Sequence, residues 1–257
     1  MSEYLDFLID IKNSDVIGQR IYKEVVLPID DIYMLTCDWH IPYHSDLWAD
    51  RVVAIARHYN IKRHIIIGDL FDCEFASHWQ KNTTFSLDEE GRQCRKTAEK
   101  LVMFEQNILI QGNHENRITR LTKGIIQAKH LFHILGGDLF MQKFQYTEFD
   151  KLRIGDKWLL VHPASYSQLP CAVAKKLCAI YHCNVINTHG HNVGRMKDVS
   201  GKYEAIDLGG LIERNKVPYV NEKTTTHPMW NKGFGMLRRG HFTHFTAETD
   251  WSLYGTT

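Results

Sequence analysis

Short apolar runs recur along this chain, and each one ends in a polar turn. The runs at residues 32–37, 65–67 and 108–110 have the length and the β-branched content of buried strands. Apolar residues at helical spacing over 46–59 predict a crossover helix, and residues 88–104 predict another, capped by Ser86 or Asp88. Because parallel strands joined by crossover helices end at one edge of their sheet, the pattern predicts an α/β fold with a ligand site at that edge.

The second half of the chain continues the alternation. Residues 152–161 predict a hairpin that turns at Gly155-Asp156, residues 172–181 a short helix, and residues 184–187 a further strand. Three later segments predict antiparallel strands: 203–208, 233–237 and 241–246. We expect residues 1–257 to form a single domain. Within it, residues 1–30 predict an N-terminal extension with a short helix, and residues 116–150 predict a variable helical insertion.

Composition narrows the class of protein. Hydrophobic residues make up 44% and charged residues 24% of the chain, which is ordinary for a globular protein. Acidic residues interrupt the first thirty positions, and no apolar run reaches membrane-spanning length. The six cysteines form no CxxC pair, so we expect reduced thiols and a cytoplasmic protein. The net charge of +1 gives no overall attraction to nucleic acid or membrane, and the oligomeric state stays open.

The polar turns carry side chains that suit a metal site. They are Asp38 and His40, Asp69 and Asp72, Asn113 and His114, His162, and His189 and His191. Carboxylate, amide oxygen and imidazole together favour Mn, Fe, Zn, Co or Ni. Seven candidate ligands exceed the needs of one ion, and Asp69 is the kind of group that can bridge two. In Asp-x-His and His-x-His, alternate side chains of an extended segment point apart. The loops must therefore kink, or the two residues serve different ions.

In this order, the motifs resemble those of the calcineurin-like metallophosphoesterases. The matching segments are DxH at Asp38, GDxxD at Gly68, GNHE at Gly112, a lone histidine and HxH at His189, over about 155 residues. The resemblance implies a four-layer α/β/β/α sandwich of two mixed sheets. It also implies the metal ligands: Asp38, His40 and His191 for the first ion, Asp69 as the bridge, and Asn113, His162 and His189 for the second.

One position departs from the family pattern. The family's last motif reads Gly-His-x-His, whereas this chain has Thr188 in place of the glycine. An alternative register through Gly190 and His191 would lose one ligand, so we prefer the register that keeps both histidines.

The resemblance implies hydrolysis of a phosphomonoester or a phosphodiester. Two divalent ions about 3.5–4 Å apart can bridge a hydroxide that attacks the phosphorus in line. We expect Mn²⁺, with Fe, Zn, Co or Ni as alternatives. His114 would be catalytic and donate to the leaving group or a phosphoryl oxygen, and Asp72 would orient His114 or another imidazole. Arg117, His44 and His78 are candidate substrate contacts.

Two other functions compete with this one. A nuclease is the main alternative within the enzyme class, because basic and aromatic residues offer a path for a single strand. They are Arg195, Lys197, Arg238, Arg239, Trp79 and Trp230. The other alternative is a non-catalytic interaction protein on the same fold. We disfavour it because such relatives typically lack the catalytic histidine or several ligands, all of which are present here.

Overall fold

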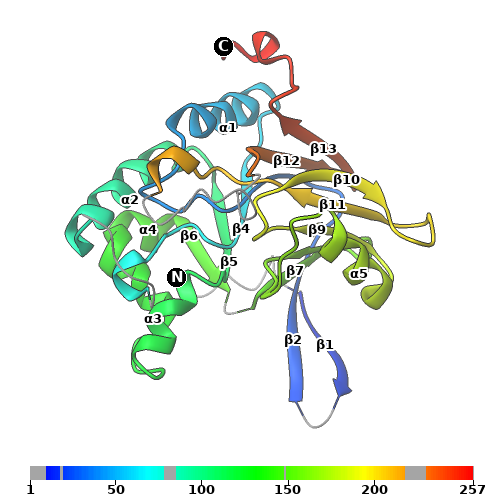
Figure 1. Cartoon of the computed structure of the whole chain (residues 1–257), viewed down its shortest axis with the longest axis horizontal. Helices are drawn as coiled ribbons and strands as arrows, with labels where there is room; N and C mark the ends of the chain where they lie inside the picture. The colour runs from blue at the N-terminus through cyan, green and yellow to red at the C-terminus, as the bar shows by residue number, and fades with distance from the viewer. Residues whose placement is uncertain (1–9, 18–19, 78–84, 148, 218–229, 257) are drawn as a thin grey trace.

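Two mixed β-sheets lie face to face at the centre of the molecule (Figure 1). The computed structural model describes residues 10–17, 20–77, 85–147, 149–217 and 230–256. Sheet I has six strands. In sheet order they are β13 (His241–Thr246), β12 (Gly233–Arg238), β3 (Ile32–Thr36), β4 (Arg63–Ile67), β5 (Gln106–Ile110) and β6 (Phe144–Thr147). In this sheet, β3 to β6 run parallel to one another, β12 runs antiparallel to β3, and the edge strand β13 runs antiparallel to β12.

Sheet II has seven strands and faces sheet I. In sheet order they are β1 (Asp10–Ile17), β2 (Arg20–Leu27), β7 (Lys151–Ile154), β8 (Trp158–Val161), β9 (Asn184–Asn187), β11 (Glu204–Leu208) and β10 (Val193–Lys197). Strands β8, β9 and β11 are mutually parallel. Their carboxyl ends therefore lie at one edge of sheet II.

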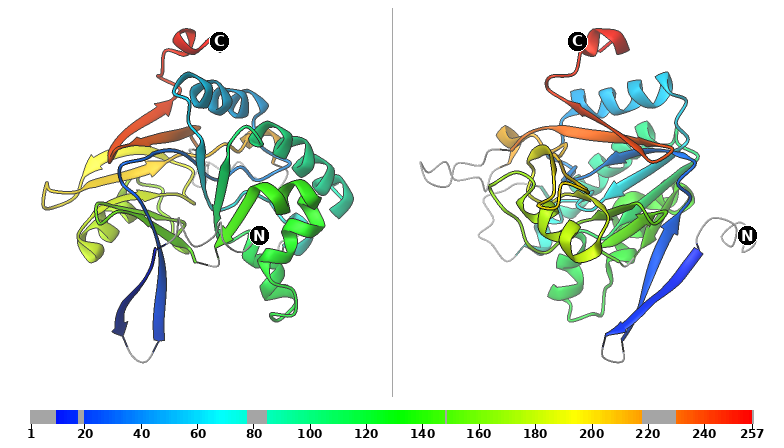
Figure 2. Two further views of the ribbon diagram at one scale, coloured as in Figure 1. Left: turned by 180° about the vertical axis from the view of Figure 1, so that it is seen from behind. Right: turned by 90° about the vertical axis from the view of Figure 1, so that its right-hand side faces the viewer.

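Helices cover the outer face of each sheet. Sheet I carries α1 (Asp46–His58), α2 (Leu87–Leu101), α3 (Glu115–Leu121) and α4 (Gly137–Lys143), and sheet II carries α5 (Ala172–Tyr181). Short 3₁₀ or π turns span Glu74–Ala76, Ala128–His130, Phe132–Gly136, Arg214–Lys216 and Trp251–Tyr254. The order helix, sheet, sheet, helix confirms the predicted four-layer sandwich, as the two views in Figure 2 also show.

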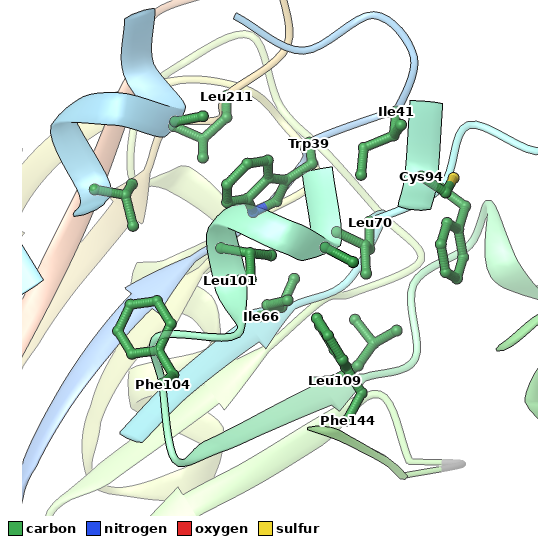
Figure 3. Packing of buried hydrophobic residues seen from close by; sticks show 14 of the residues in the cluster. Trp39, Ile41, Ile66, Leu70, Cys94, Leu101, Phe104, Leu109, Phe144 and Leu211 are labelled. Atoms are coloured by element: carbon green, nitrogen blue, oxygen red, sulfur yellow. The ribbon is translucent and has the colours of Figure 1, made fainter. Parts of the chain in front are cut away.

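The apolar runs are continuous because the sheet I strands are buried on both faces. Ile66 and Leu109 point toward the helices, where they pack with Leu101, Phe104 and their neighbours (Figure 3). Alternate residues point the other way and form the core between the sheets. This inner core includes Leu35, Ile65, Ile67 and Ile110 from sheet I and Leu152, Leu160, Ile186 and Ile206 from sheet II. Two packed faces hold each sheet I strand and fix where its terminal loop lies.

The elements on which the sequence argument depended are confirmed. They are β3, β4, β5, β9, the β7–β8 hairpin, α1, α2 and α5, and Ser86 caps α2 by accepting a hydrogen bond from the Glu89 N–H. The short helix expected within residues 1–30 is wrong for residues 10–17 and 20–27, which form the paired strands β1 and β2 that project from sheet II.

Two further regions differ from the prediction. In the region of the predicted insertion, 116–150, α3, two short turns and α4 extend to Lys143 with a non-helical break at residues 122–127, and Phe144–Thr147 then form β6, which pairs in parallel with β5. The segment 203–208 pairs in parallel with β9 and antiparallel only with the unpredicted β10. Among the described residues, no helix has both the length and the apolar character needed to cross a membrane.

Candidate metal centre

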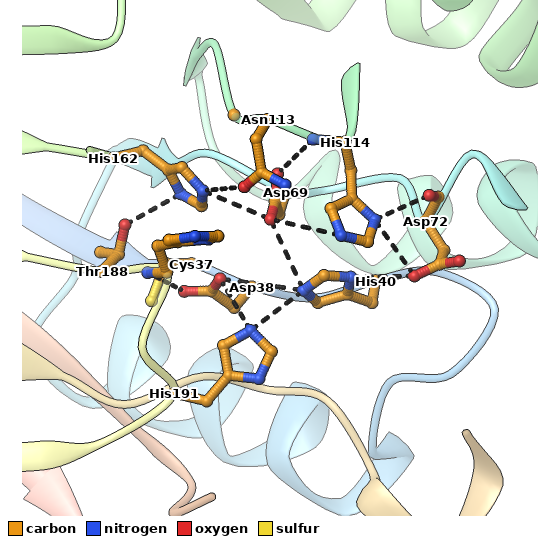
Figure 4. Close-up of polar contacts among 12 residues, drawn as sticks. Cys37, Asp38, His40, Asp69, Asp72, Asn113, His114, His162, Thr188 and His191 are labelled. Carbon is orange, nitrogen blue, oxygen red and sulfur yellow. Dashed lines mark hydrogen bonds and ion pairs between the residues drawn. The ribbon is translucent and has the colours of Figure 1, made fainter. Parts of the chain in front are cut away.

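Loops at the carboxyl ends of five strands bring the candidate ligands together (Figure 4). Sheet I contributes the loops after β3, β4 and β5, and sheet II contributes those after β8 and β9. Within the described residues, three groups of side chains have ligand atoms within 4.8 Å of one another. These are Asp38 with His40 and His191, His40 with Asp69 and His114, and Asp69 with His162 and His189.

The first group consists of Asp38, His40 and His191. Asp38 Oδ1 lies 3.2 Å from His191 Nε2 and 3.8 Å from His40 Nε2. The two imidazole Nε2 atoms lie 3.2 Å apart. The other Asp38 oxygen, Oδ2, accepts the backbone N–H of His189, so the carboxylate is held with Oδ1 directed at the imidazoles.

The other half of the centre, called the second group from here on, consists of Asn113, His162 and His189, and Asp69 borders it. His162 Nε2 lies 2.9 Å from Asn113 Oδ1 and 3.3 Å from Asp69 Oδ2. The rings of His162 and His189 lie 5.1 Å apart. Asp69 Oδ2 also lies 3.7 Å from His40 Nε2 of the first group. A single carboxylate oxygen therefore faces both groups, which is the geometry that a bridging ligand needs.

The backbone of these loops is left-handed at many candidate ligands. The φ angle is +48° at Asp38, +47° at His40, +51° at Asp69, +73° at His189 and +53° at His191. Non-glycine residues adopt such angles uncommonly, and the strain clusters at functional sites. The kink turns Asp38 and His40 into one group, whereas His189 and His191 serve different groups. The sequence left two options for an alternating motif, a kinked loop or ligands to different ions. Asp-x-His follows the first option and His-x-His follows the second.

The buried oxygens fit cations. Asp38 Oδ1 and Asp69 Oδ2 are buried, and neither has a hydrogen-bond partner among the described residues. Burial lowers the pKa of His40, but its contacts with Asp38, Asp72 and Asp69 outweigh burial and raise the pKa to about 10. Burial also lowers the pKa of His162, but the nearby charge of Asp69 outweighs this effect and raises the pKa to about 9. The carboxylates therefore draw positive charge into this cluster, as expected of a cation site.

Hydrogen bonds from Nδ1 direct the Nε2 atoms of two imidazoles at the other candidate ligands. His40 Nδ1 donates to Asp72 Oδ1 over 2.9 Å. His162 Nδ1 donates to the Ile67 carbonyl over 3.0 Å and lies 2.9 Å from the Thr188 hydroxyl. Such partners fix the ring orientation of metal-binding histidines and the nitrogen that coordinates. Thr188, which departs from the family pattern, is therefore placed to orient a candidate ligand.

His114 lies beside the cluster with Asp72 and Arg117. Its Nδ1 donates to the Asp72 carbonyl over 2.8 Å, and its Nε2 lies 3.9 Å from Asp69 Oδ2. Arg117 donates to the same Asp72 carbonyl over 2.9 Å, and its Nη2 lies 2.8 Å from His114 Nε2. Burial holds the pKa of His114 below its usual value. Asp72 thus orients both His40 and His114, and Arg117 lies where His114 faces the cluster.

Two glycines let the loops approach closely. A Cβ on Gly68, where φ is +76°, would lie 2.3 Å from His162 Nδ1. A Cβ on Gly112 would lie 2.2 Å from Asp69 Oδ1. Side chains at either position would displace a candidate ligand.

Glu115, the last residue of GNHE, was not predicted to have a role in the site. This fully buried carboxylate accepts the N–H groups of Gly112, Asp69 and Phe71 over 2.9, 3.1 and 3.0 Å. Burial, reinforced by the charge of Asp69, raises its pKa to about 7. Glu115 therefore ties the loop after β4 to the loop after β5. An acidic residue that begins a helix next to a glycine turn is the signal that points to it.

The remaining predicted contacts lie elsewhere or outside the described residues. His44 is buried against Trp39 and lies 3.2 Å from the Thr97 hydroxyl, and it belongs to none of the three groups. Its predicted contact with substrate therefore has no support in the geometry. His78 lies outside the described residues.

Comparisons with known proteins give only structural likenesses. No protein-family model matches the chain, and no curated protein matches it. The phosphoesterase YfcE from E. coli is 14% identical over 84% of this chain and 98% of its own, with a TM-score of 0.41. Vacuolar Protein Sorting 29 from Cryptosporidium parvum gives the same identity, coverage and TM-score. Nuclease MPE from Pseudomonas putida is 11% identical over 92% of this chain and 100% of its own, with a TM-score of 0.35.

Identities and TM-scores this low carry no argument about chemistry, which rests instead on the residues of this chain. Asp38, Asp69, His114, His162 and His191 meet at one edge of the sandwich, in the order that the motifs predict. In this order of site residues and in its four-layer architecture, the chain resembles the calcineurin-like metallophosphoesterases.

Proposed function

We propose that this protein is a dinuclear metal-dependent phosphoesterase that hydrolyses a phosphomonoester or a phosphodiester. The observation that carries the proposal is the position of Asp69, whose buried Oδ2 faces His40 in one group and His162 in the other. A buried structural aspartate would have hydrogen bonds to both oxygens, whereas the Asp69 carboxylate, within the described part of the chain, has one only at Oδ1, from the backbone N–H of His114. The second oxygen is left for cations.

Seven residues would hold the ions. Asp38, His40 and His191 would hold the first, Asn113, His162 and His189 the second, and Asp69 both. The mixed oxygen and nitrogen ligands favour Mn²⁺, with Fe, Zn, Co or Ni as alternatives. When bound, the ions would activate water and neutralise charge on the phosphoryl oxygens.

The residues beside the ions would act on the substrate itself. His114 Nε2 and the Arg117 guanidinium lie side by side at the edge of the cluster, where a phosphoryl group would meet them. Arg117 would hold a phosphoryl oxygen, for which its planar guanidinium is suited. His114 would donate a proton to the leaving oxygen. Asp72 would keep the His114 ring directed at the substrate through the bond from Nδ1 to its carbonyl.

A non-catalytic interaction protein is the weaker candidate. Such a protein has no need for buried, hydrogen-bond-free carboxylate oxygens or for left-handed backbone at Asp38, Asp69 and His191. These features cost stability, because unpaired polar atoms and positive φ angles are unfavourable. Their concentration at a single edge favours a functional centre over a folding role.

Two measurements on the purified protein test the proposal. Metal analysis after loading with Mn²⁺ should find about two ions per chain. The loaded protein should then hydrolyse bis(4-nitrophenyl) phosphate or 4-nitrophenyl phosphate, and chelation should abolish that activity. A folded protein that binds none of Mn, Zn, Fe, Co or Ni, or that binds two ions and hydrolyses no phosphate ester, would overturn the proposal.

A further inference from the structure

An aromatic ring lies beside each half of the candidate metal centre. The Trp230 ring lies 4.5 Å from the ring of His191, in the first group. The Tyr166 ring lies 5.7 Å from the ring of His189, in the second group. Tyr166 is 68% exposed, so packing in the core does not account for its position. A substrate held between the two ions would therefore have an aromatic neighbour at both ends.

A cavity of about 690 Å³ opens next to Trp230. Its walls include Trp230 and the start of β10, Val193 and Gly194, which follow His191 closely in the chain. The Asn231 N–H donates to the His191 carbonyl over 2.8 Å, which ties the Trp230 segment to the loop of the first group. This volume lies within the range of small-molecule sites, which is about 300–1,000 Å³. Trp230 thus both contacts a candidate ligand of the first group and lines the cavity.

The charge of the cavity suits a phosphate-linked ligand. Two cationic side chains, Arg195 and Lys232, line it against one carboxylate, Glu248. Arg195 binds Glu204 and Lys232 binds Glu213, but neither of these acidic partners lines the cavity. The lining therefore presents two ion-paired cations next to an aromatic surface. Proteins that bind single strands combine those two features, because bases stack on aromatic rings and cations follow the backbone.

A role in folding explains only part of the position of Trp230. Its ring is half-buried against the small apolar cluster of Tyr43, Ile212 and Val217. That packing needs neither the contact with His191 nor a cavity on the other side. Tyr166, on a separate loop after β8, has no part in that cluster.

We propose that the substrate is a single-stranded nucleic acid, which deepens and rests on the function proposed above. One phosphodiester occupies the metal centre, and the nucleoside on the first-group side enters the cavity and stacks on Trp230. The nucleoside on the other side stacks on Tyr166. Stacking does not read hydrogen-bond patterns, so the site accepts many base sequences.

Binding to matched oligonucleotides tests this inference. The probe is a fluorescein-labelled single-stranded thymidine 12-mer with phosphorothioate linkages that resist hydrolysis, and the reference has the same backbone with abasic sites. Anisotropy on Mn²⁺-loaded protein should show tighter binding of the thymidine strand. Trp230→Ala should weaken that binding by about 5- to 150-fold, the range for loss of one stacked base. Tyr166→Ala should weaken it less, because Tyr166 is more exposed.

Rescue and reference strands separate stacking from misfolding. Trp230→Phe and Tyr166→Phe should retain most of the affinity, and neither alanine variant should change the weak binding of the abasic strand. Equal affinity for the two strands, or unchanged thymidine binding by both alanine variants, overturns the inference. Hydrolysis of bis(4-nitrophenyl) phosphate is measured separately. A protein that hydrolyses this diester without base-dependent binding retains the proposed function and loses the inference. A protein that prefers the thymidine strand but hydrolyses no diester keeps the base-binding surface and loses the proposed function.

Discussion

The two groups of the candidate metal centre have similar ligands, but different residues hydrogen-bond to their histidines. In the first group, His40 Nδ1 donates to a carboxylate, that of Asp72, over 2.9 Å. In the second group, His162 Nδ1 faces two uncharged oxygens, the Ile67 carbonyl and the Thr188 hydroxyl. The halves share Asp69 and each adds two imidazoles, but they differ in one ligand, the carboxylate of Asp38 against the amide of Asn113, and in the residues behind the histidines.

That difference predicts unequal halves. A carboxylate behind a histidine raises the basicity of the ring as a ligand, whereas a neutral oxygen mainly fixes its orientation. We therefore expect the first group, with Asp38 and His40, to bind its ion more tightly than the second. A charged partner should also be costlier to remove than a neutral one.

The largest effect should come from the residue that the halves share. Asp69→Asn keeps an oxygen for the His114 N–H but removes the charge that faces both groups. We expect metal analysis to fall from about two ions per chain to one or fewer. Asp50→Asn, an exposed aspartate on α1, is the matched control and should retain both ions. Full occupancy in Asp69→Asn would show that the halves are independent.

The next effect concerns rate rather than metal content. His114→Ala removes no assigned ligand, so both ions should stay bound. Loss of general-acid assistance costs about 10²–10⁴-fold in kcat. The loss should be largest for alkoxide leaving groups and smaller for nitrophenolate, which needs little protonation. An equal loss on both kinds of ester, with metal content unchanged, would show that His114 binds a phosphoryl oxygen instead.

The sequence predicted the elements that the inner core holds and the residues that meet at their ends. Ile65 and Ile67 face the inner core and Ile66 the helices, so the run is apolar on both faces, as in a buried strand, and the turn after it carries ligands. The β1–β2 hairpin was missed because its pairing depends on the distant β7, which local patterns do not reveal. The residues that hydrogen-bond to the ligands were harder to predict than the ligands themselves. That Thr188 would lie behind His162, 26 residues away, depends on how β8 and β9 pair.

Removing the charged partner should weaken only the first half. Asp72→Asn retains an oxygen that can accept from His40 Nδ1 but loses the negative charge. Loss of such a partner costs about 10- to 100-fold in metal affinity. Titration calorimetry with Mn²⁺ should show the tighter of two binding steps weakened and the other retained. Because Asp72 Oδ1 also lies 3.3 Å from His114 Nδ1, activity should fall as well, so the binding isotherm is the readout that decides. A change confined to the weaker step would reverse our assignment of the halves.

The smallest effect should come from the neutral partner of the second half. Thr188→Ala removes the hydroxyl beside His162 Nδ1 but leaves the Ile67 carbonyl as a partner, so the ring keeps its orientation in part. A neutral hydrogen bond contributes about 0.5–1.5 kcal/mol, which corresponds to about 2- to 12-fold in affinity. The weaker binding step should change by that factor and the tighter step should not. Thr188→Ser restores the hydroxyl and should restore the affinity, whereas Thr188→Gly, the residue of the family pattern, should behave like alanine. Serine and alanine variants with equal affinities would mean that Thr188 supports His162 only by packing.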